Sequence, residues 1–485
     1  MKFGAVVAVG ALLSIAGAST PTKKYIKAPF KKVDDEDELV KRSNEIIAAN
    51  VKKNSGRFVM EIGVGTPLQN VTVLFSTASS SSDFYIIGAD NLFCKSNRGK
   101  KPEGDKTRVL SLKYSYPSDA SGLAYNARNL NCEKYGVFNS SNSSTFQDTG
   151  YFFFGSSDEA VVSSGSYGTD SINIGGMQLD NVTFGINNLT NTTYGELGIG
   201  LPDEIYLSNF TSVNNTNYTD PWGRISYPNP NQRQNIISMM KDQGYIKKQA
   251  YSMYFNSKKA ENGVILFGAV NSLAYEGPLL TIPVARGNDT LINVEGSTYF
   301  GYEKRSISNT TSNQTSNAKQ NAGFIASMSA LTISNNSGSS TNLLNYTVPV
   351  RFDSGNYKTY MSGNVFTNLL HYLDSPESTE YGLKMPKCPS KTDNITFTFS
   401  GGDLTLKYKD FVKKHKGKCY LDVDVILGAG DVVVLGTDFM KQVYAVYDLE
   451  DKEISLGPVT YTKKENITEI DGSVPNAIRA PDYNK

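Results

Sequence analysis

The sequence contains little histidine, tryptophan or cysteine: two, one and four residues in a chain of 485. His371 falls in a predicted helix and His415 in a lysine-rich turn, and no Gly-x-Ser-x-Gly turn is present, which argues against a Ser-His-Asp hydrolase. No glycine-rich phosphate loop or dinucleotide-binding fingerprint follows a predicted strand. No two cysteines have the Cys-x-x-Cys spacing of a metal site. The sequence therefore predicts neither a cofactor nor a metal.

Charge of one sign is not in excess either. Lys and Arg number 48 against 47 Asp and Glu, which gives a formal net charge of +1. Surfaces that bind nucleic acid or an anionic membrane need a basic excess, because positive charge supplies most of the attraction to phosphate groups. We therefore expect neither of these partners, and we expect a monomer.

Hydrophobic runs are short. Lys2 precedes an apolar run at residues 5–16, and Ala16-Gly17-Ala18 is a small-residue cleavage site, so residues 1–18 are predicted to be a secretory signal peptide. This run is shorter than the roughly 20 residues that a membrane-spanning helix needs. Residues 461–485 form a polar tail without the hydrophobic end of a GPI signal, so we expect no membrane anchor.

Aromatic residues, by contrast, are abundant. The chain has 29 tyrosines and 23 phenylalanines, and its alternating apolar runs outnumber the helical ones, which predicts an all-β fold with few short helices. The clearest helix candidates are residues 234–243 and 365–373. A chain of this length exceeds what a single core accommodates, so we expect two lobes.

Six sequence blocks and one short motif occur in a fixed order. The blocks are Gly65-Thr66-Pro67-Leu68-Gln69-Asn70, residues 164–170, 195–202, 250–255, 263–270, and 434–439 with 446–449; the motif is the apolar strand that ends in Asp353-Ser354-Gly355. Together they make the chain resemble the pepsin-like aspartic protease family, in particular fungal members of the yapsin and candidapepsin type. The resemblance covers residues 20–485.

The resemblance implies a bilobal pepsin-like acid protease fold. The amino-terminal lobe would cover residues 43–248 and the carboxyl-terminal lobe residues 249–460, followed by the tail at 461–485. Residues 19–42 would be a propeptide trimmed after Lys41-Arg42. A charged, disordered tail is the alternative for this segment. The expected ligand is a peptide or protein bound in the cleft between the lobes.

The family pattern also pairs the four cysteines, Cys94 with Cys132 and Cys388 with Cys419. The sequence alone leaves three connectivities open for a secreted chain. Sixteen Asn-x-Ser/Thr sequons, several clustered at 139–145, 188–193, 209–219 and 309–317, predict a glycoprotein of the extracellular or cell-wall space. Residues 95–131 and 304–345 resemble insertions, and we expect the second to be an exposed loop because it is rich in Ser, Asn and Thr.

Asp353 is the candidate catalytic carboxylate. Aspartic proteases use two carboxylates that share one proton and hold the attacking water between them, because two close like charges do not both ionise. Asp353 follows an apolar strand, Ser354 offers a hydroxyl and Gly355 permits a close turn. Asn356 stands where family members usually have threonine. Taken alone, Asp-Ser-Gly would also suit an ordinary turn.

The second carboxylate is missing. The apolar strand at residues 71–75 runs into Ser76-Thr77-Ala78-Ser79, so a serine stands at the degenerate catalytic position and the turn glycine has become Ala78. The run of serines at 79–82 is two residues longer than usual, and a register shifted by two would place Ala78 at the carboxylate position instead. Neither register supplies an acid. The neighbouring Asp83 matches a different family position.

The flap over the active site has also changed. Phe154-Gly155 is the nearest match to the flap's Tyr-Gly, which removes a hydroxyl. The cleft and flap candidates are therefore Thr77, Phe154, Gly155, Ser354, Gly355 and Asn356. The sequence predicts a secreted yapsin-like aspartic endopeptidase homologue that is impaired or inactive and keeps a peptide-binding cleft. The alternatives are an active endopeptidase that uses Asp353 with an unidentified carboxylate, and a decaying duplicate.

Overall fold

The structure is a computed structural model that describes residues 24–33, 57–80, 84–95, 130–156, 162–190, 192–201, 235–257, 262–285, 323–335, 337–344, 346–375, 378–379, 381–426 and 432–484. Strands dominate these residues, and their three α-helices are short: α4 (Ile236–Asp242), α5 (Gly363–Tyr372) and α6 (Thr437–Met440). The predicted all-β fold is confirmed. Two of the helices, α4 and α5, lie where the sequence predicted helices, and α6 was not predicted.

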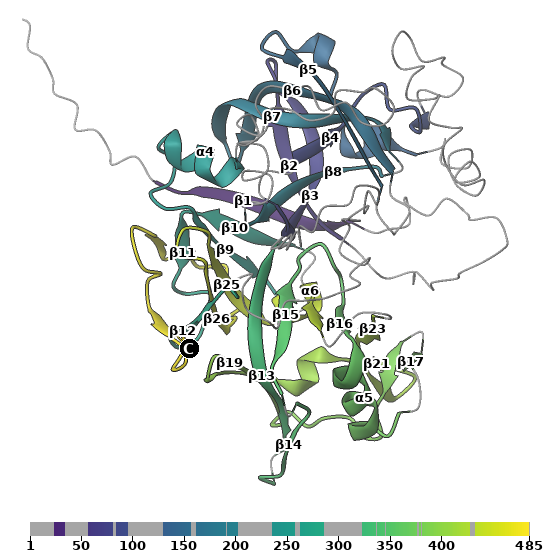
Figure 1. Cartoon of the computed structure of the whole chain (residues 1–485), viewed down its shortest axis with the longest axis vertical. Helices are drawn as coiled ribbons and strands as arrows, with labels where there is room; N and C mark the ends of the chain where they lie inside the picture. The colour runs from purple at the N-terminus through teal and green to yellow at the C-terminus, as the bar shows by residue number, and fades with distance from the viewer. Residues whose placement is uncertain are drawn as a thin grey trace, which may run out of the picture.

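One fourteen-stranded sheet extends through the molecule (Figure 1). Its first six strands in spatial order are β28 (Ala477–Arg479), β12 (Leu279–Pro283), β26 (Glu453–Pro458), β25 (Val443–Asp448), β9 (Ala250–Phe255) and β10 (Asn262–Phe267). The next eight are β1 (Ile26–Val33), β2 (Arg57–Val64), β3 (Gln69–Ser80), β8 (Gly195–Gly200), β4 (Phe84–Ile87), β7 (Met177–Thr190), β6 (Val162–Ile174) and β5 (Gln147–Ser156).

A second, eight-stranded sheet lies in the lower half of Figure 1. Its strands are β20 (Gly402–Lys407), β19 (Asn394–Phe399), β13 (Phe324–Ser334), β15 (Val348–Phe352), β24 (Val433–Leu435), β16 (Thr359–Met361) and β23 (Val423–Val425), with β14 (Ser340–Asn342) paired to β13. Two small sheets complete the described strands: β11 (Ala269–Asn271) with β27 (Ile467–Glu469), and β17 (Ser378–Thr379), β18 (Gly382–Lys384), β22 (Lys418–Leu421) and β21 (Val412–His415).

Strand β13 corrects one expectation from the sequence. The region 304–345 was predicted to be an exposed loop, yet Phe324–Ser334 forms a strand between β15 and β19. Phe324, Ala326 and Met328 are buried and alternate with less buried residues, as a strand with one face on a core requires. The Ser, Asn and Thr content of the surrounding region hid this alternation. Residues 304–322 lie outside the described residues.

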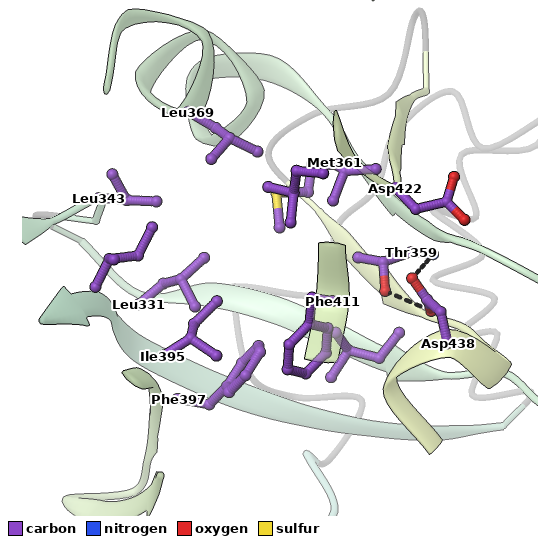
Figure 2. Close-up of a pocket in the computed structure, with 14 residues that line it drawn as sticks. Leu331, Leu343, Thr359, Met361, Leu369, Ile395, Phe397, Phe411, Asp422 and Asp438 are labelled. Carbon is purple, nitrogen blue, oxygen red and sulfur yellow. Dashed lines mark hydrogen bonds between the residues drawn. The ribbon is translucent and has the colours of Figure 1, made fainter. Parts of the chain in front are cut away.

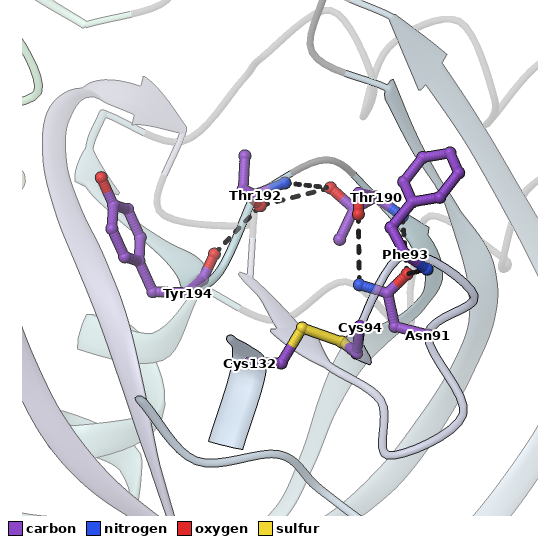
Figure 3. The surroundings of a disulfide bond; sticks show 7 residues. All are labelled: Asn91, Phe93, Cys94, Cys132, Thr190, Thr192 and Tyr194. Atoms are coloured by element: carbon purple, nitrogen blue, oxygen red, sulfur yellow. Dashed lines mark hydrogen bonds between the residues drawn. A yellow bond between two sulfur atoms is a disulfide. The ribbon is translucent and has the colours of Figure 1, made fainter. Parts of the chain in front are cut away.

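Both predicted disulfides are confirmed. Cys94 pairs with Cys132 and Cys388 with Cys419, at Cα–Cα distances of 5.5 and 5.3 Å. Beside the first, the Asn91 side chain donates to the carbonyl of Thr190 (3.1 Å) and accepts from its N–H (3.2 Å), which ties the disulfide-bonded loop to β7 (Figure 3).

No helix of the described residues is long and apolar enough to cross a bilayer.

Strand β1 links the two halves of the large sheet. It pairs antiparallel with β10 on one side (Ile26 opposite Phe267) and with β2 on the other (Phe30 opposite Met60), and among the described strands no other pairing joins these halves. The Phe30 ring lies 4.9 Å from the Phe75 ring and 5.1 Å from the Phe255 ring, centroid to centroid. This strand belongs to the segment that was predicted to be a propeptide, so that segment supplies a central part of the fold.

We expect Phe30→Ala to lower the free energy of unfolding by about 3–5 kcal/mol, because it removes a fully buried ring that contacts both halves of the sheet. Urea unfolding of the full chain measures the loss. Lys31→Ala, on the exposed face of the same strand, is the matched control and should change stability by less than about 0.5 kcal/mol. Equal effects of the two substitutions would show that β1 contributes nothing through its buried face.

Candidate active site

Two loops, one after Phe75 within β3 and one after β15, meet through a reciprocal pair of hydroxyl groups. The Thr77 hydroxyl donates to the carbonyl of Phe352 (2.9 Å) and accepts from the N–H of Ser354 (2.9 Å). The Ser354 hydroxyl donates to the carbonyl of Phe75 (3.0 Å) and accepts from the N–H of Thr77 (3.0 Å). All four bonds are buried, so together they fix each loop against the other.

This reciprocity assigns the register of the degenerate motif. Thr77 and Ser354 make the same two contacts in opposite directions, so the residues before them, Ser76 and Asp353, occupy equivalent positions. The shifted register, with Ala78 at the carboxylate position, does not have this symmetry. Asp83 and the last two residues of the serine run, 81–82, lie outside the described residues.

The two equivalent residues face one another. An ideal Cβ placed on Gly355 would lie 3.1 Å from Asp353 Oδ1 and 3.3 Å from Ser76 Oγ, so both oxygens lie close to one point. Only a glycine leaves that point open. Ser76 and Asp353 are both buried, with 4% and 8% of their surfaces exposed. The position between them suits a polar atom shared by the two groups.

Ser76 and Asp353 are held by similar backbone contacts but differ chemically. Ser76 Oγ accepts from the N–H groups of Ala78 (3.3 Å) and Ser79 (3.2 Å). Asp353 accepts from the N–H of Gly355 (2.9 Å) and from the side-chain amide of Asn356 (2.8 Å). Asn356 therefore binds the Asp353 carboxylate through its side chain. A hydroxyl with both lone pairs occupied by N–H groups still donates its proton, but it is no base near neutral pH.

One glycine and one buried cation pack against the first loop. A Cβ on Gly200 would approach the carbonyl oxygens of Thr77 and Ser79 to 2.6 Å each, so the glycine at the end of β8 lets the first loop pack closely. The buried guanidinium of Arg351 donates from Nη2 to the carbonyl of Ala78 at 2.8 Å. Arg351 thus adds a charge-assisted bond between β15 and the first loop.

The second loop leads into β16, and Asp438 at the start of α6 binds Thr359, the first residue of that strand. The Asp438 carboxylate accepts from the N–H of Thr359 (3.1 Å) and from the Thr359 hydroxyl (2.9 Å). Figure 2 shows these bonds at the polar end of a small cavity of about 20 Å³ whose other walls are mainly apolar side chains of the carboxyl-terminal core. Burial, reinforced by the neighbouring Asp422, raises the pKa of Asp438 to about 6.

The flap candidates lie in the hairpin of β5 and β6. Phe154 is opposite Ser164 and Gly155 is opposite Ser163 in that antiparallel pair. The tip of the hairpin, residues 157–161, and the side chains of Phe154 and Gly155 lie outside what the structure describes. Farther along β6, the hydroxyl of Tyr167 lies 3.3 Å from that of Tyr85, which ties β6 to β4.

Sequence reasoning missed one carboxylate at this site. The Ser79 hydroxyl donates to Oε1 of Glu196 on β8, while the Ser79 N–H donates to Ser76 Oγ. Glu196 belongs to the block at 195–202, which was used only to support the family resemblance. An acid inside an otherwise apolar and glycine-rich element was the available signal, because such a residue needs a polar partner.

Two lobes that share a sheet and present equivalent loops, tied by reciprocal hydroxyls, define an aspartic protease fold. The chain belongs to the eukaryotic aspartyl protease family, which it matches over residues 57–459.

Its relatives include fungal enzymes. It is 29% identical to aspartic proteinase 3 of Saccharomyces cerevisiae over 95% of this chain and 82% of that protein, and 30% identical to aspartic proteinase yapsin-3 of the same yeast over 100% and 83%. It is also 30% identical to secreted aspartic protease 9 of Candida albicans over 70% and 55%.

We expect Thr77→Val to lower the free energy of unfolding by about 2–6 kcal/mol, since the buried N–H of Ser354 and carbonyl of Phe352 each lose a partner at about 1–3 kcal/mol. Chemical denaturation measures this loss. Thr405→Val on the exposed face of β20 is the control and should stay within about 0.5 kcal/mol of the unsubstituted protein. A loss no larger than the control's would mean that the reciprocal hydroxyls do not hold the loops together.

The raised pKa of Asp438 predicts a pH effect on stability. The native state holds this proton more tightly than the unfolded chain, so its contribution is full below about pH 4 and is lost as pH rises through about 6. Relative to Asp438→Asn, the unsubstituted protein should lose on the order of 3 kcal/mol between pH 4 and pH 7. Urea unfolding at several pH values measures this loss, with Asp403→Asn at an exposed position of β20 as control. If the free energy of unfolding changes with pH in parallel for the unsubstituted protein and Asp438→Asn, the prediction is wrong.

Proposed function

We propose that this protein is a secreted, glycosylated yapsin-like aspartic protease homologue whose peptide-bond hydrolysis is severely impaired, and that it keeps its interlobe cleft as a peptide-binding site. One observation carries the proposal: Ser76 occupies the position equivalent to Asp353 and has no carboxylate. General acid and general base roles are each worth roughly 10²–10⁴-fold in rate, and both must act on one water.

The binding function is supported by what remains intact. The reciprocal hydroxyls, Asp353, Gly355 and Arg351 keep the two loops in a closely packed arrangement without the first carboxylate. Proteases of this family bind peptide substrates in the cleft between the lobes, and that surface needs the loops but not the shared proton. An extended peptide or protein segment is therefore the ligand class we propose.

We further propose the layout that the family implies: a signal peptide over 1–18, a propeptide over 19–42 that is trimmed after Arg42, lobes at 43–248 and 249–460, and a tail at 461–485. In this layout β1 of the trimmed propeptide would stay paired with β2 and β10, and the tail contributes β27 and β28 to the sheets. A relative is named a secreted protease, and the sequon clusters support an extracellular or cell-wall location. Without its own dyad, the protein would depend on a separate processing protease for trimming.

Cleavage of a denatured protein substrate at acidic pH tests the impairment. We expect a rate lower than that of an intact yapsin-type relative by on the order of 10²–10⁴, because one acid–base role is missing. Any remaining cleavage should be blocked by pepstatin and abolished by Asp353→Ala. Robust pepstatin-sensitive cleavage at the relative's rate would overturn the proposal.

Repair of the motif sharpens the test. Ser76→Asp with Ala78→Gly restores the two altered residues, and we expect only part of the activity to return, because misplacement by about 1 Å already costs on the order of 100-fold. The altered flap and Asn356 remain in the repaired protein. Full activity on repair would show that the cleft has not been reshaped for binding.

A second candidate function, an active aspartic endopeptidase that cleaves secreted or cell-wall proteins, needs another carboxylate near Ser76. One observation favours it: the hydrogen bond between Ser79 and Glu196.

A further inference from the structure

Glu196 on β8 lies on the same face of the sheet as Ser76, which belongs to the neighbouring strand β3. β8 runs parallel to β3, with Glu196 opposite Leu74 and Gly198 opposite Ser76. Leu197 is fully buried in the core, so Glu196 points to the other face. Paired residues of neighbouring strands point to the same side of a sheet, so Glu196 lies on the Ser76 side, one residue pair away.

Ser79 connects these two groups. Its N–H donates to Ser76 Oγ at 3.2 Å, and its hydroxyl donates to Glu196 Oε1. The close packing of the Ser79 carbonyl against Gly200 keeps the loop against β8 and so keeps Ser79 over Glu196. A single residue therefore contacts both the degenerate position and a carboxylate.

The role of each hydroxyl depends on whether its proton and its oxygen lone pairs are already used in hydrogen bonds. Ser76 Oγ receives two N–H groups and has only its own proton to offer. Ser79 donates its proton to Glu196, which leaves the lone pairs of its oxygen to receive a proton from another donor. Ser76 Oγ thus has a proton to donate and no lone pair left to accept one, whereas the oxygen of Ser79 can still accept a proton beside the Glu196 carboxylate.

We propose that Glu196, acting through Ser79, is the second titratable carboxylate of this centre and a positioning residue for the water beside Asp353. The inference deepens the proposed function, since it names the group that carries the hydrolysis remaining after the loss at Ser76. The added hydroxyl between carboxylate and water lengthens the proton path, which accounts for a slow reaction.

The hydrolytic step balances with these groups alone. The water oxygen bonds to the peptide carbonyl carbon, its proton passes to Ser79 Oγ, and the Ser79 proton passes to the Glu196 carboxylate. Protonated Asp353 gives its proton to the carbonyl oxygen. When the C–N bond breaks, Asp353 takes back a proton from the diol, and Glu196 returns one through Ser79 to the leaving amine.

The test is the pH profile of kcat/KM for a denatured protein substrate, measured on the full chain at high protein concentration. Only the hydrolysis that pepstatin blocks is counted. We expect slow hydrolysis with two limbs, one for each carboxylate. Glu196→Gln, whose amide oxygen still accepts from Ser79, should lower kcat/KM by on the order of 10²-fold or more and remove one limb. Ser79→Ala should do the same, and Glu196→Asp should restore part of the rate.

Glu61→Gln, an exposed carboxylate on β2, is the matched control and should leave the profile unchanged. Three results would overturn the inference: an equal loss at every pH for Glu196→Gln, an unchanged profile, or no hydrolysis above an Asp353→Asn background. All three leave the proposed impairment standing. Activity equal to that of an intact relative would overturn the impairment alone, and the Glu196→Gln profile would still decide the role of Glu196.

Discussion

The reciprocal hydrogen bonds between Thr77 and Ser354 are the constraint on which this centre depends. They join residues 277 positions apart in the sequence and use only hydroxyls and backbone groups. The geometry of the two loops therefore does not depend on which side chains stand at positions 76 and 353. This separation explains how a serine can stand at position 76 while Asp353 keeps its hydrogen bonds and its place opposite.

Loss of the first acid also changes the energetics of the centre. Two carboxylates this close repel one another, and an active enzyme tolerates that cost because it needs one shared proton. With Ser76 in place, a neutral hydroxyl with two N–H partners faces a single acid. A hydroxyl at position 76 therefore avoids the repulsion that a second carboxylate would create beside Asp353.

Much of the fold and part of the site could be predicted from the sequence. Alternating apolar runs and the Asp353-Ser354-Gly355 motif identified both loop-bearing strands, because these features are local in sequence. The disulfide pairing came from the family pattern, since four cysteines alone allow three connectivities. Strand β13 was missed because the composition of its neighbourhood concealed its period. Glu196 was missed because its role arises from a strand pairing and a loop contact that no local pattern contains.

The central place of β1 has a consequence for the order in which the chain folds. Its partner β10 lies roughly half a chain away, so at about 5–20 residues per second the ribosome needs on the order of 10–50 s to supply it. During that interval β1 has β2 as its only available pairing partner in the large sheet, so the edge that will bind β10 stays open beside the apolar residues Ile26, Ala28 and Phe30. Lys27, Pro29 and Lys31 alternate with these residues on the exposed face. Charge and a missing N–H are the features that discourage a waiting strand from pairing with another molecule, so the segment carries its own protection against aggregation until its partner is made.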